Sequence, residues 1–479
     1  MKARIFALIV IVAMLFSAFG IDNARAGAYA TQFTTSVTYM NVGTAPTTTL
    51  KLYFYATPAD TTPTSITRPN LAVNAASSVY IGNLDDTVVA DGFQGSAYLE
   101  SDQMMQVTLV QIPQNSTDVK NRALSNGFIS GGPTALIATV LKATFDANTI
   151  FSVQNADTVL NNVTIDFINT SAVVVKTITT PIAAGAAYYV DMGLLDLTPL
   201  TALNGSVVIT AKRADNSAGK VVASAMELNV AGIGVYAFEG VEAGANEIFM
   251  PSYLCAKWSQ TSYYAVQNTS LTTATSVTVT YKDTLNNTYT QTLPIGPGAK
   301  ASFNACNAAP ANTYGAAVVT STVTPVIAIG KVSGGGLSTA FNGVAMGSEV
   351  MGLPYVRWAT DINYNAGTGQ RTNITIQNIG NPLVETDRIY IDYYDYAGTK
   401  VGTHTIELGV GGLPTGSKVN SNATNAGLLE FGYYGTIYGG AAIVRGPTGS
   451  ELTAVARVSS YVVTTGLIVA EDYNSQPIR

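Results

Sequence analysis

The residues that could perform chemistry in this chain are few. His404 is its only histidine, and a Ser-His-Asp or Cys-His nucleophile arrangement would have to use it. It lies in the segment 402–407, where alternating residue types place it beside threonines on a strand face. Histidine and cysteine together supply too few ligands for an ordinary zinc site. We therefore expect His404 at a surface or strand edge, and we expect no enzymatic activity, no cofactor and no metal site.

The densest acidic stretch is the next candidate site, because paired carboxylates can hydrolyse glycosides. Its members are Glu385, Asp387, Asp392 and Asp395, with tyrosines at 390, 393 and 394. Such a mixture of acids and aromatic rings could also bind sugar or calcium. However, Asp387 precedes an expected strand and Asp395 lies in the turn after it, where turn geometry alone favours aspartate. We expect mainly structural roles for these residues.

Cys255 and Cys306 are the only cysteines. In an exported chain such a pair is expected to form a disulfide. This bond would close a loop of about 50 residues and stabilise the protein by about 3 to 4 kcal/mol on the chain-entropy model.

The first 26 residues have the features of a secretory signal peptide. Lys2 and Arg4 form a basic start, residues 5–19 are an apolar run, and residues 24–26 form a small-x-small cleavage site. We predict cleavage after Ala26 and a secreted, extracellular or cell-surface location. No later apolar run reaches about 18 residues, so we expect no transmembrane segment.

The composition limits the partners. A net charge of −6 lacks the clustered positive field that nucleic acid requires. Only 11% of the residues are charged, whereas about 25% is usual. Threonine, serine and asparagine must therefore supply the polar surface. Either the protein is a secreted β protein with threonine-rich outer faces, or neighbouring copies cover those faces.

Two phrases recur four times along the chain. The first is a strand-like phrase ending in asparagine, at 37–41, 151–155, 264–268 and 374–378, and the second begins at Gly95, Gly205, Gly315 and Gly440. A period near 110 residues matches one small all-β domain. Alternation of apolar and polar residues, as at 277–281, predicts half-buried antiparallel strands. The sequence thus predicts an all-β protein of four tandem antiparallel β-sandwich domains.

We place the four domains at residues 27–132, 133–248, 249–351 and 352–479, after the signal peptide at 1–26. Pro133, Pro251 and Pro354 mark the joints, because proline suits the point where one domain gives way to the next. The first repeat lacks this proline joint. Short apolar linkers predict a semi-rigid rod.

The repeated Ile-x-Ile-Gln-Asn strand, the Val-Thr-Val-Thr-Tyr strand that follows it and the Gly-Ala-Ala phrase resemble tandem immunoglobulin-like modules of bacterial secreted and cell-surface proteins. The resemblance covers about residues 30 to 475. It implies an immunoglobulin-like sandwich and a scaffold, adhesive or appendage role, and it carries over no catalytic residue.

Eight Asn-x-Ser/Thr triplets are candidate glycosylation sites. Their asparagines are Asn115, Asn162, Asn169, Asn204, Asn268, Asn286, Asn373 and Asn422.

We expect an extracellular structural protein, a subunit of a self-assembling surface filament, sheath or matrix fibre. Its main partner would be itself, as a homopolymer, through a threonine-rich arm at 28–37 that pairs with an edge strand of the next copy. Glycans or other surface proteins are further candidate partners. The alternative is a monomeric adhesin or glycan-binding array, with the acidic-tyrosine stretch of the fourth repeat as its site.

Overall fold

The computed structural model describes residues 32–114, 121–229, 234–359, 369–434, 437–462 and 467–478. These residues form strands that pair antiparallel throughout, with short 3-10 turns and no α-helix among them. The predicted all-β class is confirmed. The predicted signal peptide and Asn115 lie outside the described residues. Within the described part, no helix is both long and apolar enough to cross a membrane.

The first two repeats each form a two-sheet sandwich. In the first, an inner sheet has the order β4-β1-β6-β7 and an outer sheet the order β3-β2-β5. In the second, the corresponding orders are β12-β9-β14-β15 and β11-β10-β13-β8. The strands are β1 (Gln32–Asn41), β2 (Leu50–Tyr55), β3 (Thr64–Thr67), β4 (Ala76–Tyr80), β5 (Ser96–Ser101), β6 (Met105–Gln114), β7 (Ala123–Asn126), β8 (Thr134–Lys142), β9 (Ala147–Asn155), β10 (Asn161–Asn169), β11 (Val174–Ile182), β12 (Ala187–Asp191), β13 (Leu203–Arg213), β14 (Val221–Asn229) and β15 (Val235–Glu239).

The last two repeats follow the same plan. The third has sheets β20-β17-β22-β23 and β19-β18-β21-β16; the fourth has β25-β26-β33-β34, with β29 also on β26, and β28-β27-β32-β24-β35. The strands are β16 (Glu247–Cys255), β17 (Thr261–Asn268), β18 (Thr275–Asp283), β19 (Thr288–Ile295), β20 (Lys300–Asn304), β21 (Thr313–Ser321), β22 (Val326–Gly334), β23 (Leu337–Asn342), β24 (Val350–Leu353), β25 (Trp358–Ala359), β26 (Gln370–Asn378), β27 (Arg388–Asp395), β28 (Lys400–Glu407), β29 (Lys418–Asn422), β32 (Gly440–Arg445), β33 (Leu452–Val462), β34 (Leu467–Asn474) and β35 (Gln476–Pro477); β30 (Tyr433–Tyr434) and β31 (Ile437–Tyr438) form a separate hairpin.

The four sandwiches confirm the predicted repeat architecture at the level of sandwich-like units. In the second repeat, the first strand, β8, pairs with the sixth, β13, and the second strand, β9, pairs with the fifth and the seventh. An immunoglobulin constant domain has its first strand beside its second. The pairing of β8 therefore differs from that arrangement.

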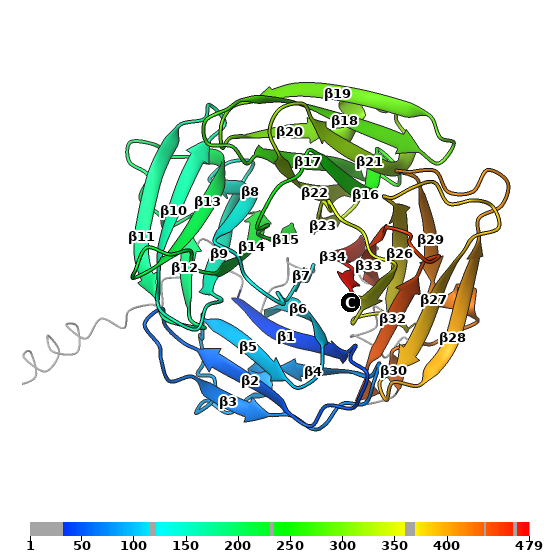
Figure 1. Ribbon diagram of the computed structural model, residues 1–479, viewed down its shortest axis with the longest axis horizontal. Helices are drawn as coiled ribbons and strands as arrows, with labels where there is room; N and C mark the ends of the chain where they lie inside the picture. The colour runs from blue at the N-terminus through cyan, green and yellow to red at the C-terminus, as the bar shows by residue number, and fades with distance from the viewer. Residues whose placement is uncertain are drawn as a thin grey trace, which may run out of the picture.

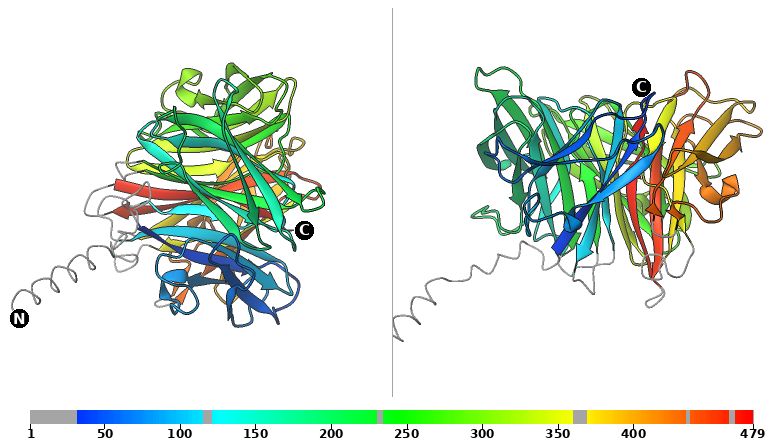
Figure 2. Two further views of the ribbon diagram at one scale, coloured as in Figure 1. Left: turned by 90° about the vertical axis from the view of Figure 1, so that its left-hand side faces the viewer. Right: turned by 90° about the horizontal axis from the view of Figure 1, so that it is seen from below.

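The sandwiches close into a ring, and the predicted semi-rigid rod is wrong (Figure 1). The last inner strand of each repeat lies near the middle of the ring, where β7 contacts β15, β15 contacts β23, β23 contacts β34, and β34 contacts β7. The inner-sheet strands run roughly along the ring axis (Figure 2). The composition of one linker describes a single joint. Ring closure depends on the rotation between neighbouring sandwiches, summed over all four joints.

The repeated asparagine explains why every copy keeps the same phrase. The second strand of each inner sheet ends in an asparagine, and all four asparagines are fully buried: Asn41, Asn155, Asn268 and Asn378. Each side-chain amide donates to loop carbonyls on both sides; that of Asn155, for example, donates to Val159 and Ile182 at 2.8 Å. The side-chain oxygen accepts a backbone N–H two residues on. Because buried loop carbonyls must find donors, this residue is required for folding and carries no chemistry.

The residue before that asparagine joins neighbouring sandwiches. The Nε2 atoms of Gln154, Gln267 and Gln377 donate to carbonyls in the second phrase of the preceding repeat, at Ala97, Val207 and Ala317. The first repeat has Met40 at this position, and Met40 lies in an apolar cluster with Ala441 and Ile443 of the fourth repeat. At this position three joints thus have a glutamine hydrogen bond, whereas the closing joint has an apolar contact; hydrogen bonds elsewhere in the closing joint include that of Gln106 Nε2 to the carbonyl of Gln476 at 2.6 Å.

Candidate functional site: a cleft beside an incomplete sandwich

Among the described residues, the outer sheet of the first sandwich has fewer strands than the outer sheets of the other three sandwiches. In the second, third and fourth repeats, the outer sheet contains the first strand of the repeat, β8, β16 or β24, paired beside β13, β21 or β32. The outer sheet of the first repeat ends at β5, and no described strand pairs with the far side of β5. The edge strand therefore presents unpaired backbone groups on that side.

In the complete repeats, the first strand fills the space between two sandwiches. Nearly every residue of β8 and β16 is buried. The side chains of Leu136 and Ile137 on β8 share one core cluster with Ala265, Ile327 and Ile329 of the third repeat. A first strand therefore completes its own sandwich and also packs against the next one.

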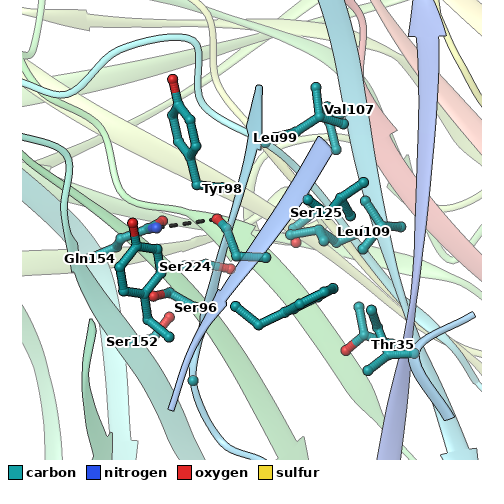
Figure 3. Close-up of a pocket in the computed structure, with 18 of the residues that line it drawn as sticks. Thr35, Ser96, Tyr98, Leu99, Val107, Leu109, Ser125, Ser152, Gln154 and Ser224 are labelled. Carbon is teal, nitrogen blue, oxygen red and sulfur yellow. Dashed lines mark hydrogen bonds between the residues drawn. The ribbon is translucent and has the colours of Figure 1, made fainter. Parts of the chain in front are cut away.

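At the joint between the first and second sandwiches, this space is a cleft with a volume of about 1680 Å³. One wall consists of core residues of the first sandwich, of which Phe93, Leu99 and Leu109 are partly exposed while Leu52 and Phe54 are buried. Leu99 and Leu109 are drawn in this wall in Figure 3. These side chains line a space that a strand covers in the other repeats, and burying the surface that Phe93, Leu99 and Leu109 still expose would be favourable.

The opposite wall is the inner sheet of the second sandwich and is more polar. Register places Ser152 and Ser224 where the third repeat has Ala265 and Ile329. Both serines line the cleft near Gln154, whose Nε2 donates to the carbonyl oxygen of Ala97 at 3.2 Å (Figure 3). Hydroxyl groups on this wall suit a ligand that brings its own hydrogen-bonding groups.

Two tyrosines border the cleft, one from each sandwich. Tyr98 on β5 is 54% exposed and Tyr189 on β12 is 36% exposed. Tyrosine offers a broad apolar face with a polar end. The cleft therefore combines a sheet edge, an apolar wall, hydroxyl groups and aromatic rings.

In the part of the chain that the structure describes, the charged residues that line the cleft are all acidic. They are Asp86, Asp91, Asp157 and Asp191. Asp157 forms an ion pair with Arg213 at 2.7 Å, and this hydrogen bond lowers the pKa of its carboxyl group. Asp191 accepts the backbone N–H of Gly193 at 2.8 Å. Asp86 and Asp91, both exposed, stand on the first-repeat side.

The sequence contained one signal of this cleft. The three proline joints belong to the first strands: Pro133 precedes β8, Pro251 lies in β16 and Pro354 follows β24. The first repeat has neither this proline nor, among its described residues, such a strand. The missing proline thus coincides with the free edge of β5.

The predicted donor arm does not fill the edge. Residues 32–37 of the arm lie in β1, which pairs with β4 on one side and β6 on the other. This part of the prediction is therefore wrong, because the segment completes its own inner sheet. Residues 28–31 lie outside the described part of the chain.

The other predicted chemical residues lie far from the cleft in the sequence, and the structure does not bring them together. His404 is on the outer-sheet edge strand β28, half-buried, with its Nδ1 2.8 Å from the hydroxyl of Ser421. Burial lowers the pKa of its imidazole. The prediction of a strand-edge histidine is confirmed.

In the acidic-tyrosine stretch, the carboxyl groups of Asp392 and Asp395 have partners within the fourth sandwich. Asp392 is held by Thr403 at 2.6 Å and by Arg445 at 3.2 Å, and Asp395 accepts two backbone N–H groups of its turn. Tyr393 and Tyr394 are buried. Within the described ranges, no three histidine, cysteine or acidic side chains are grouped so that they could hold a metal ion.

The two cysteines are bonded, and the glycosylation triplets differ in exposure. Cys255 and Cys306 form a disulfide, as predicted. Asn162, Asn286 and Asn373 are exposed, and Asn169, Asn204 and Asn422 are half-buried. Asn268 is fully buried and its amide donates to Thr273 at 2.7 Å. The prediction of Asn268 as a glycosylation site is therefore wrong for the folded protein, since its amide is enclosed.

No protein-family model matches the sequence, and no curated protein matches it either.

Proposed function

We propose that the protein is an exported structural subunit of a surface filament, sheath or matrix, joined to a neighbouring chain by β-strand addition at the free edge of β5. The observation that carries the proposal is the incomplete first sandwich beside its cleft. Strand addition provides affinity through backbone hydrogen bonds and specificity through side-chain pockets. Here an apolar wall lies beside the edge, so an added strand gains both kinds of contact.

Three further features support export and assembly. The chain begins with residues typical of a signal peptide. Its disulfide is of the kind that persists in an oxidising compartment. The low charge content weakens the repulsion that keeps sheet edges apart.

The proposal is tested by locating the protein and then obstructing the cleft. Immunogold electron microscopy of the source cells should place gold on an extended surface structure. Ser224→Trp puts a bulky ring into the cleft and should leave the secreted protein folded but unincorporated. Ser276→Trp, at a similarly half-buried serine of the third sandwich, is the matched control and should be incorporated normally. Label found only on dispersed protein, or equal incorporation of both variants, would overturn the proposal.

A glycan-binding adhesin is the second candidate, now centred on the cleft. The observation that favours it is the pair of exposed tyrosines, Tyr98 and Tyr189, among serine hydroxyls. Aromatic faces and a few polar groups are a common arrangement for small ligands. A glycan array with the mature protein tests it: binding that Ser224→Trp abolishes supports an adhesin, and an array without specific hits argues against it.

A further inference from the structure

The complete repeats show how the end of a first strand is anchored. In the second repeat, the Nζ atom of Lys142, the last residue of β8, donates to the carbonyls of Met192, Gly193 and Leu195 at 3.0, 3.0 and 2.8 Å. These carbonyls belong to the turn that follows β12. The lysine therefore ties the end of the outer-sheet strand to the end of the inner sheet.

The third repeat makes the same connection covalently. Cys255, the last residue of β16, is bonded to Cys306 in the 3-10 turn that follows β20. Gly193 and Cys306 are equivalent, because each donates its N–H to the side chain of the residue two before it, Asp191 at 2.8 Å and Asn304 at 3.0 Å. One lysine and one disulfide thus perform the same task.

The first repeat contains the equivalent of this turn, but no first strand is described in that repeat for the turn to anchor. Its counterpart is the 3-10 turn Ile81–Asn83 after β4, with Gly82 at the position of Gly193 and Cys306. Ile81, Gly82 and Leu84 all line the cleft. The aspartates Asp86 and Asp91 lie shortly beyond this turn, and none of the described residues that line the cleft is a lysine or an arginine. An incoming basic group would meet carbonyl oxygens and negative charge there.

The edge of β5 also has a defined register for an incoming strand. Gly95 corresponds to Gly205 in the repeated phrase, so residues 97–100 correspond to 207–210 of β13. In the second repeat, residues 207–210 pair antiparallel with residues 134–137 of β8. A strand added to β5 in the same way points its C-terminal end toward the turn at Ile81–Asn83.

We propose that the cleft binds a nine-residue extended segment of a partner protein, antiparallel to β5, with a lysine or arginine at its C-terminal end held by the turn at residues 81–84. The segment is apolar on the side facing Leu52 and Phe54, and it carries serine or threonine on the side facing Ser152 and Ser224. This inference deepens the proposed function and rests on it, because it names the chemistry of the joining strand.

The chain itself is a poor source of this segment. By the spacing of Asn41 and Asn155, the residues equivalent to β8 are 20–28. This stretch includes Asp22 and Arg25 at interior positions and spans the predicted cleavage site after Ala26. This stretch is therefore not the donor, and the proposed donor is an extended segment of a different polypeptide.

The test uses peptides with the sequences of the first strands of this chain. The peptide of residues 247–255 ends in cysteine and is incubated with the full mature protein carrying Gly82→Cys, in a glutathione redox buffer. We expect a mixed disulfide, measured by intact mass, in at least tenfold higher yield than with Gly193→Cys, where β8 already occupies the space. A peptide of reversed sequence should react no better than that control. Equal yields for the two variants, or for the two peptide directions, would overturn the inference.

A second measurement needs no cysteine and tests the basic end. The peptide of residues 134–142 should protect the amides of β5 from hydrogen exchange in the unmodified mature protein. Replacing its last residue, Lys142→Ala, should weaken binding about tenfold. Unprotected β5 amides, or equal affinity of both peptides, would contradict the inference. The immunogold experiment tests the proposed function separately from these peptide measurements. Surface labelling without peptide binding would refute only the proposed chemistry of the joining segment. Peptide binding without surface labelling would refute the structural role.

Discussion

Asn126 and Glu239 meet at the centre of the ring, where the backbone N–H of Asn126 donates to the Glu239 carboxylate. The equivalent residues of the other two repeats continue the circle. Asn126 Nδ2 donates to the carbonyl of Asn474 at 2.8 Å, Asn474 Nδ2 to Asn342 at 2.9 Å, and Asn342 Nδ2 to Glu239 at 2.9 Å. This circle joins all four sandwiches. Glu239 places a carboxylate where the other three repeats have an amide.

Glu239 should make the stability of the ring depend on pH. Burial raises the pKa of its carboxyl group from 4.5 to about 7. Between these values the folded protein holds a proton that the unfolded chain releases, so the free energy of unfolding falls as the pH rises through this window. Glu239→Gln should match the wild type at pH 4.5 and exceed it at pH 8 by on the order of 2 to 3 kcal/mol in urea unfolding. Glu247→Gln, at an exposed strand end, should show no such gain; parallel pH profiles for Glu239→Gln and the wild type would contradict this role.

Lys300 should produce the opposite pH dependence. Its Nζ donates to Thr139 across the joint between the second and third sandwiches at 2.7 Å, and burial lowers its pKa from 10.5 to about 7. Between pH 7 and 10.5 the unfolded chain binds the additional proton, so this group makes stability rise with pH. Lys300→Met should raise stability at pH 6 by on the order of 2 kcal/mol and less at pH 10. Lys212→Met, at an exposed position, is the control, and a uniform loss at both pH values would show that the hydrogen bond dominates.

The glutamines at the joints should contribute different amounts to the free energy of unfolding, because they differ in burial. Gln267 is fully buried and its Nε2 lies 3.2 Å from the Gly298 carbonyl and 3.4 Å from that of Val207. Gln267→Ala removes a buried donor from both carbonyls, although that of Gly298 still accepts the Ser206 hydroxyl at 2.7 Å, and should cost about 1 to 3 kcal/mol. Gln154→Ala, beside the open cleft, should cost less than half of that, because water reaches its partners. Thermal unfolding of both variants measures the difference; equal losses would mean that the cleft is not solvated.

The disulfide should act locally on the third sandwich. The double variant Cys255→Ser with Cys306→Ser releases a loop with a sequence separation of 51 and should lose about 3 to 4 kcal/mol. Hydrogen exchange should show the loss first in β16, whose end is no longer tied to the turn after β20. Unchanged exchange in β16 with a global loss elsewhere would contradict the anchoring role.

Much of the local structure could be predicted from the sequence. Alternation at Val277, Val279 and Tyr281 placed three side chains in the core, where all are fully buried, because a strand turns successive residues to opposite faces. The disulfide is predictable because the chain has only two cysteines. The repeated asparagine is visible in the sequence, but its hydrogen bonds to buried carbonyls depend on the positions of the surrounding loops.

The candidate site could not be predicted in the same way. Asp392 and Tyr393 looked like a binding patch, yet one is paired with Arg445 and the other is buried, and both facts depend on strands from elsewhere in the chain. The cleft depends on an edge left open at β5, which no residue within β5 encodes.

The sequence by itself determined the strands, their fourfold repetition and the disulfide, because alternation, turns and cysteine number are local or countable properties. Only the tertiary structure decided that the sandwiches close into a ring and that the first sandwich has no described strand beside Ala97 and Tyr98. The physical reason is that the contacts Met40 makes with Ala441 and Ile443, like the walls of the cleft, join residues far apart in sequence. Their meeting depends on how all four sandwiches pack together.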